Sequence, residues 1–272
     1  MKAAIVACSD GQKREYSDQN TELLHFLEKQ GMDMVCSKCI YEKQGVFPGT
    51  VEERASQLMK MFADDDIDEI YDISGGDIAN MILDELDFEV IGKSKARFWG
   101  YSDLTTIINA IYTMTGKSSV LYQVKNMVRG SFQAEQRARF MNREELFHPR
   151  FEFICGKKIE GIVIGGNVRC FLKLAGTKYF PDLKGKVLLL EALGGDAPQI
   201  ATCFAQLKQL GVFEKISGIL LGTFTHLEAN GNDAYDLIKE YAGDLPIART
   251  RDIGHGHDAK AICIGKEISL SF

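Results

Sequence analysis

The sequence lacks the features of a membrane-embedded or nucleic-acid-binding protein. No apolar run in its 272 residues approaches the roughly 20 residues that a membrane-spanning helix requires. Lysines and arginines are scattered rather than clustered, and the formal net charge is −6, so we expect neither a nucleic acid nor a membrane as partner. The apolar start at residues 1–8 is too short for the core of a signal peptide. We predict that it forms a buried strand.

The cysteines offer little for a metal site. There are seven, an odd number, and only Cys36 and Cys39 form a C-x-x-C pair. A structural zinc site requires a second pair or histidines at matching spacing, and the sequence has neither. Scattered reduced cysteines are typical of the cytoplasm. We therefore expect a cytoplasmic protein, with no metal and no other cofactor.

The first half of the chain alternates short apolar runs with amphipathic segments. Thr50 and Glu53 form a capping box that predicts a helix start. Alternating strands and helices predict a parallel sheet covered on both faces, with ligands bound at the carboxyl ends of the strands. The predicted strands are 3–7, 32–36, 67–73, 98–101 and 118–122, and the predicted helices are 18–30, 50–64, 77–86 and 103–115.

The second half shows a different pattern, which predicts a second domain. Residues 126–150 are polar and helix-prone, as expected of a connector or a lid. Short β-prone runs then crowd together at 151–155, 161–164, 187–190, 218–222 and 261–264, interrupted by helical segments at 197–210 and 234–242. We therefore predict an α/β protein with an N-terminal parallel-sheet domain (1–125), a connector (126–150) and a smaller, β-rich α+β C-terminal domain (151–272).

A serine lies where a predicted strand turns into a predicted helix. The strand ends at Gly100 and Tyr101, Ser102 follows, and Asp103 opens a strongly helical segment. Serine hydrolases present their nucleophile on such a turn, where the helix N-terminus favours negative charge. The match to the G-x-S-x-G elbow is partial, because Leu104 replaces the second glycine. The alternative is that Ser102 or Asp103 only caps the helix.

A serine nucleophile also needs a base and an acid that orients the base. Among five histidines, His226 follows a strand end, whereas His255 and His257 lie in a segment whose glycines allow close approach to a substrate. Glu191 ends the apolar run 187–190, which suits a rigidly held acid. The alternative for Glu191 is an ordinary ion pair with a lysine.

The same histidines also permit a metal interpretation. His255, His257 and Asp258 resemble half of a metal site, and His226 and Asp252 are the only further ligands on offer. A hydrolytic zinc site needs at least three protein ligands with supporting groups around them.

An oxyanion hole requires two backbone N–H groups aimed at the developing charge. The amide of Asp103, directly after the candidate nucleophile, is one. Gly76, in the Gly75-Gly76 pair after the strand at 67–73, is the predicted second donor, because glycine permits close approach. The alternative is an ordinary tight turn.

Several segments together, in order along almost the whole chain, resemble the LD-carboxypeptidase family of serine peptidases. The segment around Ser102 resembles the family's G-Y-S-D-[ILV]-T motif, residues 190–191 resemble its L-E, and Gly254-His255 with Gly265 resembles its G-H…G ending. The other matching segments are 53–55, 65–70, 165–167, 176–177, 181–186, 206–213 and 218–224.

This resemblance implies that Ser102 is the nucleophile, Glu191 the orienting acid and His255 the base, with the spacing to Gly265 favouring His255 over His257. It also implies a parallel α/β N-terminal domain, a smaller β-rich C-terminal domain, an active site between them, and a cytoplasmic homodimer. The implied reaction cleaves the amide between an L-centre and a C-terminal D-amino acid, typically D-Ala of murein tetrapeptides.

Two other functions stay open. A sister branch of the family confers immunity to microcin-type peptide-nucleotides by a similar hydrolysis, and a catalytically quiet ligand-binding relative is a third possibility. The immunity branch stacks its nucleotide on an aromatic side chain from a loop, whereas the only tryptophan here, Trp99, lies in a predicted strand.

The departures from the family pattern bear on the substrate pocket. Ser74 stands where the family commonly has the arginine of R-G-G, residues 122–124 replace a G-P dipeptide, and the loop at 192–195 lacks the usual acid pattern. The substrate carboxylate needs a basic partner, and arginine suits it through its bidentate fork. Arg97, Arg129 and Arg169 are the candidates, and the sequence does not rank them.

Overall fold

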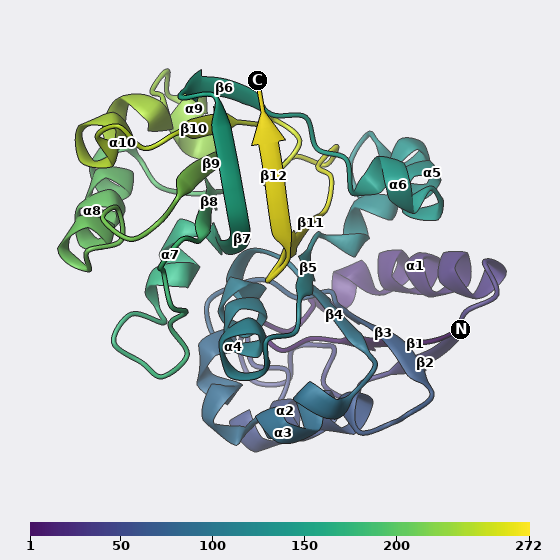
Figure 1. Ribbon diagram of the computed structural model, residues 1–272. Coiled ribbons are helices and arrows are strands. Elements are labelled where there is room, and N and C mark those ends of the chain that lie inside the picture. The colour runs from purple at the N-terminus through teal and green to yellow at the C-terminus, as the bar shows by residue number, and fades with distance from the viewer.

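Five strands from the first half of the chain and one from near its C-terminal end form a six-stranded sheet in the order β11-β5-β4-β3-β1-β2 (Figure 1). The computed structural model describes residues 1–272. Five of these strands are parallel, as predicted, and β11 runs antiparallel to β5. The strands are β1 (Lys2–Val6), β2 (Asp33–Cys36), β3 (Ile67–Asp72), β4 (Arg97–Gly100), β5 (Ser119–Leu121) and β11 (Ile262–Ile264).

Helices cover both faces of this first sheet. The Thr50–Glu53 capping box is present at the start of α2, which confirms that prediction. Leu58, Ile82 and Ile107 lie in the core on one face, and Leu23 and Leu27 in the core on the other. The elements are α1 (Ser17–Lys29), α2 (Val51–Phe62), α3 (Phe88–Lys93), α4 (Thr105–Thr115) and the short 3₁₀ helices η1 (Arg14–Tyr16), η2 (Ala79–Glu85) and η3 (Ser102–Leu104).

The second half forms another six-stranded sheet, in the order β12-β7-β8-β9-β10-β6. Its four central strands are parallel, and the edge strands β12 and β6 are antiparallel to their neighbours. The strands are β6 (Glu152–Cys155), β7 (Lys158–Asn167), β8 (Val187–Ala192), β9 (Gly218–Phe224), β10 (Ile247–Arg249) and β12 (Glu267–Ser271), and the helices are α7 (Val168–Leu172), α8 (Ala197–Gln209), α9 (Thr225–Ala229) and α10 (Ala234–Ala242).

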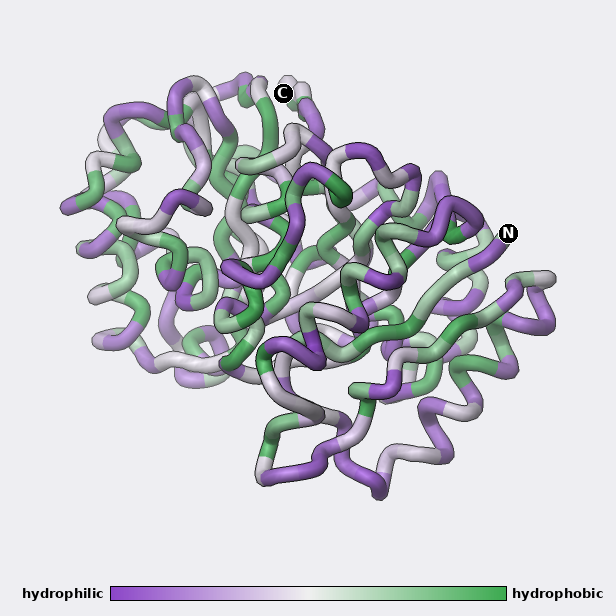
Figure 2. The backbone as a smooth tube through the Cα atoms, turned by 90° about the horizontal axis from the view of Figure 1, so that it is seen from below, coloured by the Kyte–Doolittle hydropathy of each residue, from purple (hydrophilic) through white to green (hydrophobic).

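The two sheets share one hydrophobic core. Helix α4 contacts β4 and β5 of the first sheet as well as β7 and α7 of the second half. Ile107 and Ile108 of α4 belong to the same buried cluster as Val163 and Leu189 from the second sheet. Figure 2 shows hydrophobic segments gathered inside the molecule and hydrophilic ones along the outside. Burial of this shared surface fixes how the halves sit, because apolar burial is the main favourable term in folding.

The predicted α/β class with two sheet-containing regions is confirmed. The domain boundaries at residues 125 and 150 stay a prediction, and β11 shows that the chain returns to the first sheet after completing four central strands of the second. The predicted helix at 77–86 is the 3₁₀ helix η2, and β10, β12, α3, α7 and α9 were not predicted. None of the helices combines the length and the apolar composition that a membrane span requires.

The predicted connector packs against the first sheet. It contains α5 (Gln133–Met141), α6 (Arg143–Leu146) and the end of the 3₁₀ helix η4 (Val124–Met127). The Arg143 guanidinium lies 4.7 Å from the ring centre of Trp99 and 4.0 Å from that of Phe140. The cation–π contact with Trp99 attaches the connector to the sheet. The Gln136 amide Nε2 donates to the carbonyl oxygens of His257 and Ala259.

Candidate active site

Ser102 occupies a strained turn at the carboxyl end of β4. It is the only residue other than glycine with a positive φ, at 54°. A left-handed conformation costs an L-residue roughly 1–2 kcal/mol, so neighbouring contacts must hold it. The Leu104 N–H donates to the Tyr101 carbonyl at 3.0 Å. A Cβ at Gly100 would lie 2.6 Å from the Leu104 Cβ, so glycine is required where the turn folds back.

The side chain of Asp103 anchors this turn. It is fully buried, and its Oδ2 accepts from the Ser9 hydroxyl at 2.7 Å and from the Ala79 N–H at 2.8 Å. Its Oδ1 accepts from Lys173 Nζ at 2.6 Å. Burial lowers the pKa of Lys173, but the hydrogen bonds to Asp103 and Asp77 and the nearby negative charge together outweigh that effect, so its pKa lies above the usual value and the ammonium stays charged. Asp103 therefore joins three separate segments at the nucleophile.

Glu191, His255 and Ser102 form one hydrogen-bonded line. Glu191 Oε2 lies 2.6 Å from His255 Nδ1, and His255 Nε2 lies 3.1 Å from Ser102 Oγ. Glu191 is on β8 and fully buried, and the His255 side chain is 7% exposed. A bond to Nδ1 selects the tautomer in which Nε2 can accept the serine proton. The structure thus brings together the three side chains that the sequence singled out.

The loop that carries His255 packs closely against the end of β9. The Thr223 N–H donates to the Ile253 carbonyl at 2.9 Å. Gly254 has a φ of 148°, and a Cβ there would lie 1.8 Å from Thr223 Oγ1, so only glycine fits. The Tyr101 ring lies 4.5 Å from the imidazole of His255. Burial raises the pKa of Tyr101 well above its usual value, so this neighbour stays uncharged.

Gly76 lies in the loop after β3, beside the Ser102 turn. Its φ is 126°, and a Cβ there would lie 2.0 Å from Asp10 Cγ, so the position requires glycine. The neighbouring Asp77 N–H donates to Asp10 Oδ1 at 3.1 Å, and the bond from Ala79 to Asp103 attaches the loop to the nucleophile turn. The Gly76 N–H donates to no group of the protein, so it is available to a substrate oxygen.

The other histidines of the sequence analysis lie elsewhere. His257 is exposed, and its ring packs where a Cβ of Gly130 would be. His226 is exposed on α9, at a cavity of about 430 Å³ that Asp196 also lines. Asp252 pairs with Lys260 at 3.3 Å. No three histidine, cysteine, aspartate or glutamate side chains are grouped so that they could hold a metal ion.

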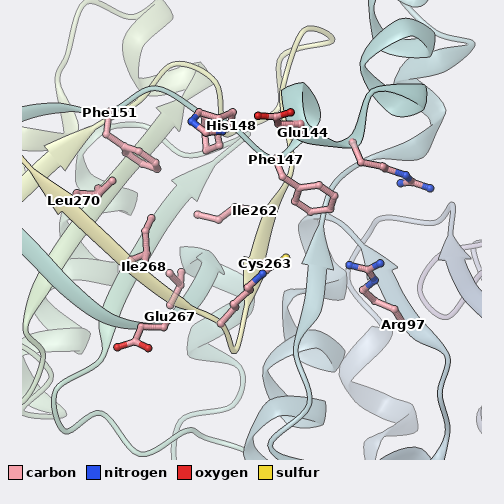
Figure 3. Close-up of a pocket in the computed structure, with 14 residues that line it drawn as sticks. Arg97, Glu144, Phe147, His148, Phe151, Ile262, Cys263, Glu267, Ile268 and Leu270 are labelled. Atoms are coloured by element: carbon pink, nitrogen blue, oxygen red, sulfur yellow. The ribbon is translucent and has the colours of Figure 1, made fainter.

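A cavity of about 480 Å³ lies away from Ser102, His255 and Glu191 (Figure 3). Arg97, at the amino end of β4, lines it, whereas Ser102 follows the carboxyl end of the same strand. Phe147 from the connector and Ile262 from β11 form part of its wall. Arg97 pairs there with Glu69 at 3.2 Å. The cavity is therefore separate from the hydrogen-bonded line of Ser102.

Sequence reasoning missed the contacts that position the site. The Lys173–Asp103 ion pair and the contact of Tyr101 with His255 join residues far apart in the chain. No sequence motif marks Lys173. It follows α7 directly, and only the folded structure shows that α7 contacts the Ser102 turn.

Comparison with known proteins identifies both halves. The sequence pattern of the LD-carboxypeptidase N-terminal domain matches residues 3–122, and that of the LD-carboxypeptidase C-terminal domain matches residues 160–270. Together the two matches cover most of the chain.

Individual relatives resemble it along nearly its whole length. The probable murein peptide carboxypeptidase of Bacillus subtilis (strain 168) is 29% identical over 269 residues, covering 93% of this chain and 83% of that protein. The microcin C7 self-immunity protein MccF of Escherichia coli is 24% identical over 289 residues, covering 92% and 84%. The structure of MccF in complex with glutamyl sulfamoyl guanosine superposes with a TM-score of 0.88 at 21% identity, covering 100% of this chain and 96% of that one.

Proposed function

The chain belongs to the LD-carboxypeptidase family of peptidases, and from that premise we propose that it is a serine carboxypeptidase that removes a C-terminal D-amino acid from murein peptides. The observation that carries the proposal is the line from Glu191 through His255 to Ser102, with bonds of 2.6 and 3.1 Å. Ser102 sits at its end, half-buried, on the strained turn that follows β4.

In the first half of the reaction, Ser102 Oγ attacks the carbonyl carbon of the last amide bond. His255 Nε2 takes the hydroxyl proton and then gives it to the nitrogen of the leaving D-amino acid. Glu191 holds the imidazole in the required tautomer and stabilises the imidazolium, because its charge lies next to Nδ1 in a buried place. The C–N bond breaks, and an ester to Ser102 remains.

In the second half of the reaction, water attacks the ester carbonyl carbon. His255 takes a proton from the water and returns it to Ser102 Oγ, which restores the starting state. In both halves the carbonyl oxygen carries negative charge in the tetrahedral intermediate. The amides of Gly76 and Asp103 are the proposed donors to this oxygen, and donors fixed in advance stabilise it without reorganisation.

Hydrolysis of peptidyl nucleotides, as in the immunity branch, is the second candidate. The fold supports it, because the superposed MccF binds glutamyl sulfamoyl guanosine. Trp99 gives it no support, because this tryptophan is fully buried in β4 and cannot stack on a nucleotide. We therefore place murein peptides first. The cytoplasmic location and the homodimer remain predictions from the family resemblance.

The decisive experiment offers both substrates to the purified protein. We expect release of free D-Ala from a murein tetrapeptide, detected by mass spectrometry, and little turnover of a peptidyl adenylate. The Ser102→Ala protein serves as the control for contaminating peptidases. Cleavage of the adenylate alone would assign the immunity-type reaction, and turnover of neither substrate would contradict the proposal.

A further inference from the structure

The last residue of a carboxypeptidase substrate carries a free carboxylate, which the structure must meet with a cation. This inference rests on the proposed function. An extended residue spans about 3.5 Å, so the carboxylate of a single leaving residue lies close to the scissile carbonyl. The cation must therefore lie next to the proposed oxyanion amides.

Arg169 stands at this place. It lies on α7, which contacts the Ser102–Leu104 turn. Its Nη1 donates to Asp77 Oδ1, and Asp77 directly follows Gly76, the proposed oxyanion donor. The neighbouring cation Lys173 is unavailable, because it is already bonded to the buried carboxylate of Asp103 and to Asp77.

The Arg169 guanidinium has its other donors free. Its side chain is 57% exposed, and Nη1 is its only nitrogen with a protein partner. Nε and Nη2 form the edge of the guanidinium that binds a carboxylate through two parallel hydrogen bonds. Asp77 holds the opposite side and thereby orients that edge.

The two other arginines of the sequence analysis are less suited. Arg97 lies at the amino end of β4 and is paired with Glu69. Arg129 lies 5.8 Å from the ring centre of Tyr16, and no bond ties it to the oxyanion loop.

We propose that Arg169 is the specificity residue that binds the substrate's terminal carboxylate through Nε and Nη2, with Asp77 as its positioning residue. Arginine fixed in this way selects peptides that end in a free acid over otherwise identical peptides that end in an amide.

The test compares a murein tetrapeptide ending in D-Ala with the same peptide ending in D-alaninamide. Hydrogen bonds to charged groups are strong enough that Arg169→Met should lower kcat/KM for the acid about 10- to 100-fold, mainly through KM. The amide should change less than about 3-fold. Arg169→Lys should restore part of the loss, and Arg97→Met is the matched control that should change neither substrate. An unchanged ratio of acid to amide in Arg169→Met would overturn the proposal.

A binding measurement separates this proposal from the proposed function. Calorimetry on the Ser102→Ala protein needs no turnover, so it works even if the wild type releases no D-Ala. We expect the acid to bind more tightly than the amide, and Arg169→Met in the same background to abolish the difference. Equal binding of acid and amide with Arg169 present would contradict the carboxylate site, whether or not the peptidase reaction occurs.

Discussion

The first half of the molecule places its nucleophile through a turn of consecutive residues, whereas the second half supplies an acid and a base that lie 64 residues apart in the chain. Ser102 is held by its own strand and by the bonds of Asp103. Glu191 is part of a central strand, and His255 sits on the loop that leaves the second sheet and returns to the first. The position of the nucleophile is thus set by the local strained turn, whereas the positions of its partners are set by the packing of the two halves.

This difference explains why Lys173 matters. It comes from the second half, yet it neutralises the carboxylate that anchors the nucleophile turn in the first. A buried charge without a partner is costly, so the pair favours the arrangement in which both halves are docked. Substitutions in the strained turn and substitutions in the contacts between the halves should therefore differ in their effects on activity and stability.

The largest effect should follow removal of the nucleophile. Ser102→Ala should lower kcat by about six orders of magnitude, while its melting temperature stays close to that of the wild type. Single-turnover kinetics and a thermal scan measure the two quantities. A variant that keeps most of the activity would show that Ser102 is only a helix-cap residue.

The next effect tests the long-range partners. Glu191→Gln keeps the size of the side chain but no longer stabilises the imidazolium, so kcat should fall about 10⁴-fold. His257→Ala is the matched control and should stay within a few-fold of wild type, because this exposed ring has no bond to Glu191. If His257→Ala were the more damaging change, the base would be His257.

The bridge between the halves can be broken by Lys173→Met. Asp103 would then be buried without a compensating charge, so the free energy of unfolding should fall by about 3–5 kcal/mol, measured by urea titration. Lys178→Met provides the comparison, because its pair with Asp84 is exposed on both sides and is worth less than about 1 kcal/mol. Equal losses of unfolding free energy in both variants would show that the Lys173–Asp103 pair stabilises the protein no more than an exposed ion pair does.

The oxyanion amide calls for a change that spares the backbone. Proline cannot adopt the φ of 126° at Gly76, so glycolic acid in place of Gly76 is the better probe, since it replaces only N–H by oxygen. Loss of one such donor costs about 2.7–4 kcal/mol, or roughly 10²–10³ in kcat. The same exchange at Gly75 is the control. If kcat is retained, another group donates to the oxyanion.

The smallest effect concerns the strain itself. Glycine adopts a positive φ without strain. The free energy of unfolding of the inactive Ser102→Gly variant should therefore be about 1 kcal/mol higher than that of Ser102→Ala, although glycine adds entropy to the unfolded chain. Denaturant titration of both variants gives the difference. Equal stabilities would mean that the turn stores no strain.

The sequence predicted the local features of the site well. The turn at Ser102, the capping box of α2 and most strands of the first sheet follow from patterns within a few residues. The pairing of Glu191 with His255 was reached through the family resemblance, since periodicity says nothing about which loop meets which strand.

What the sequence did not predict lacks a strong local pattern. Strand β10 has three residues and follows a parallel neighbour, too short for a periodic signal. In β12, Ile268 and Leu270 do alternate with polar residues, but the strand only pairs at the edge of the second sheet. Contacts such as that of Lys173 with Asp103 depend on tertiary packing alone.

The last two strands have a consequence for how the molecule unfolds. Only Gly265 and Lys266 separate β11 from β12, yet β11 pairs with β5 in the first sheet and β12 with β7 in the second. A chain cut near residue 150 would leave the first fragment without its edge strand and the second with an unpaired β11. The two halves should therefore behave as a single cooperative unit, with one shared unfolding transition, and regain structure only when both fragments are combined.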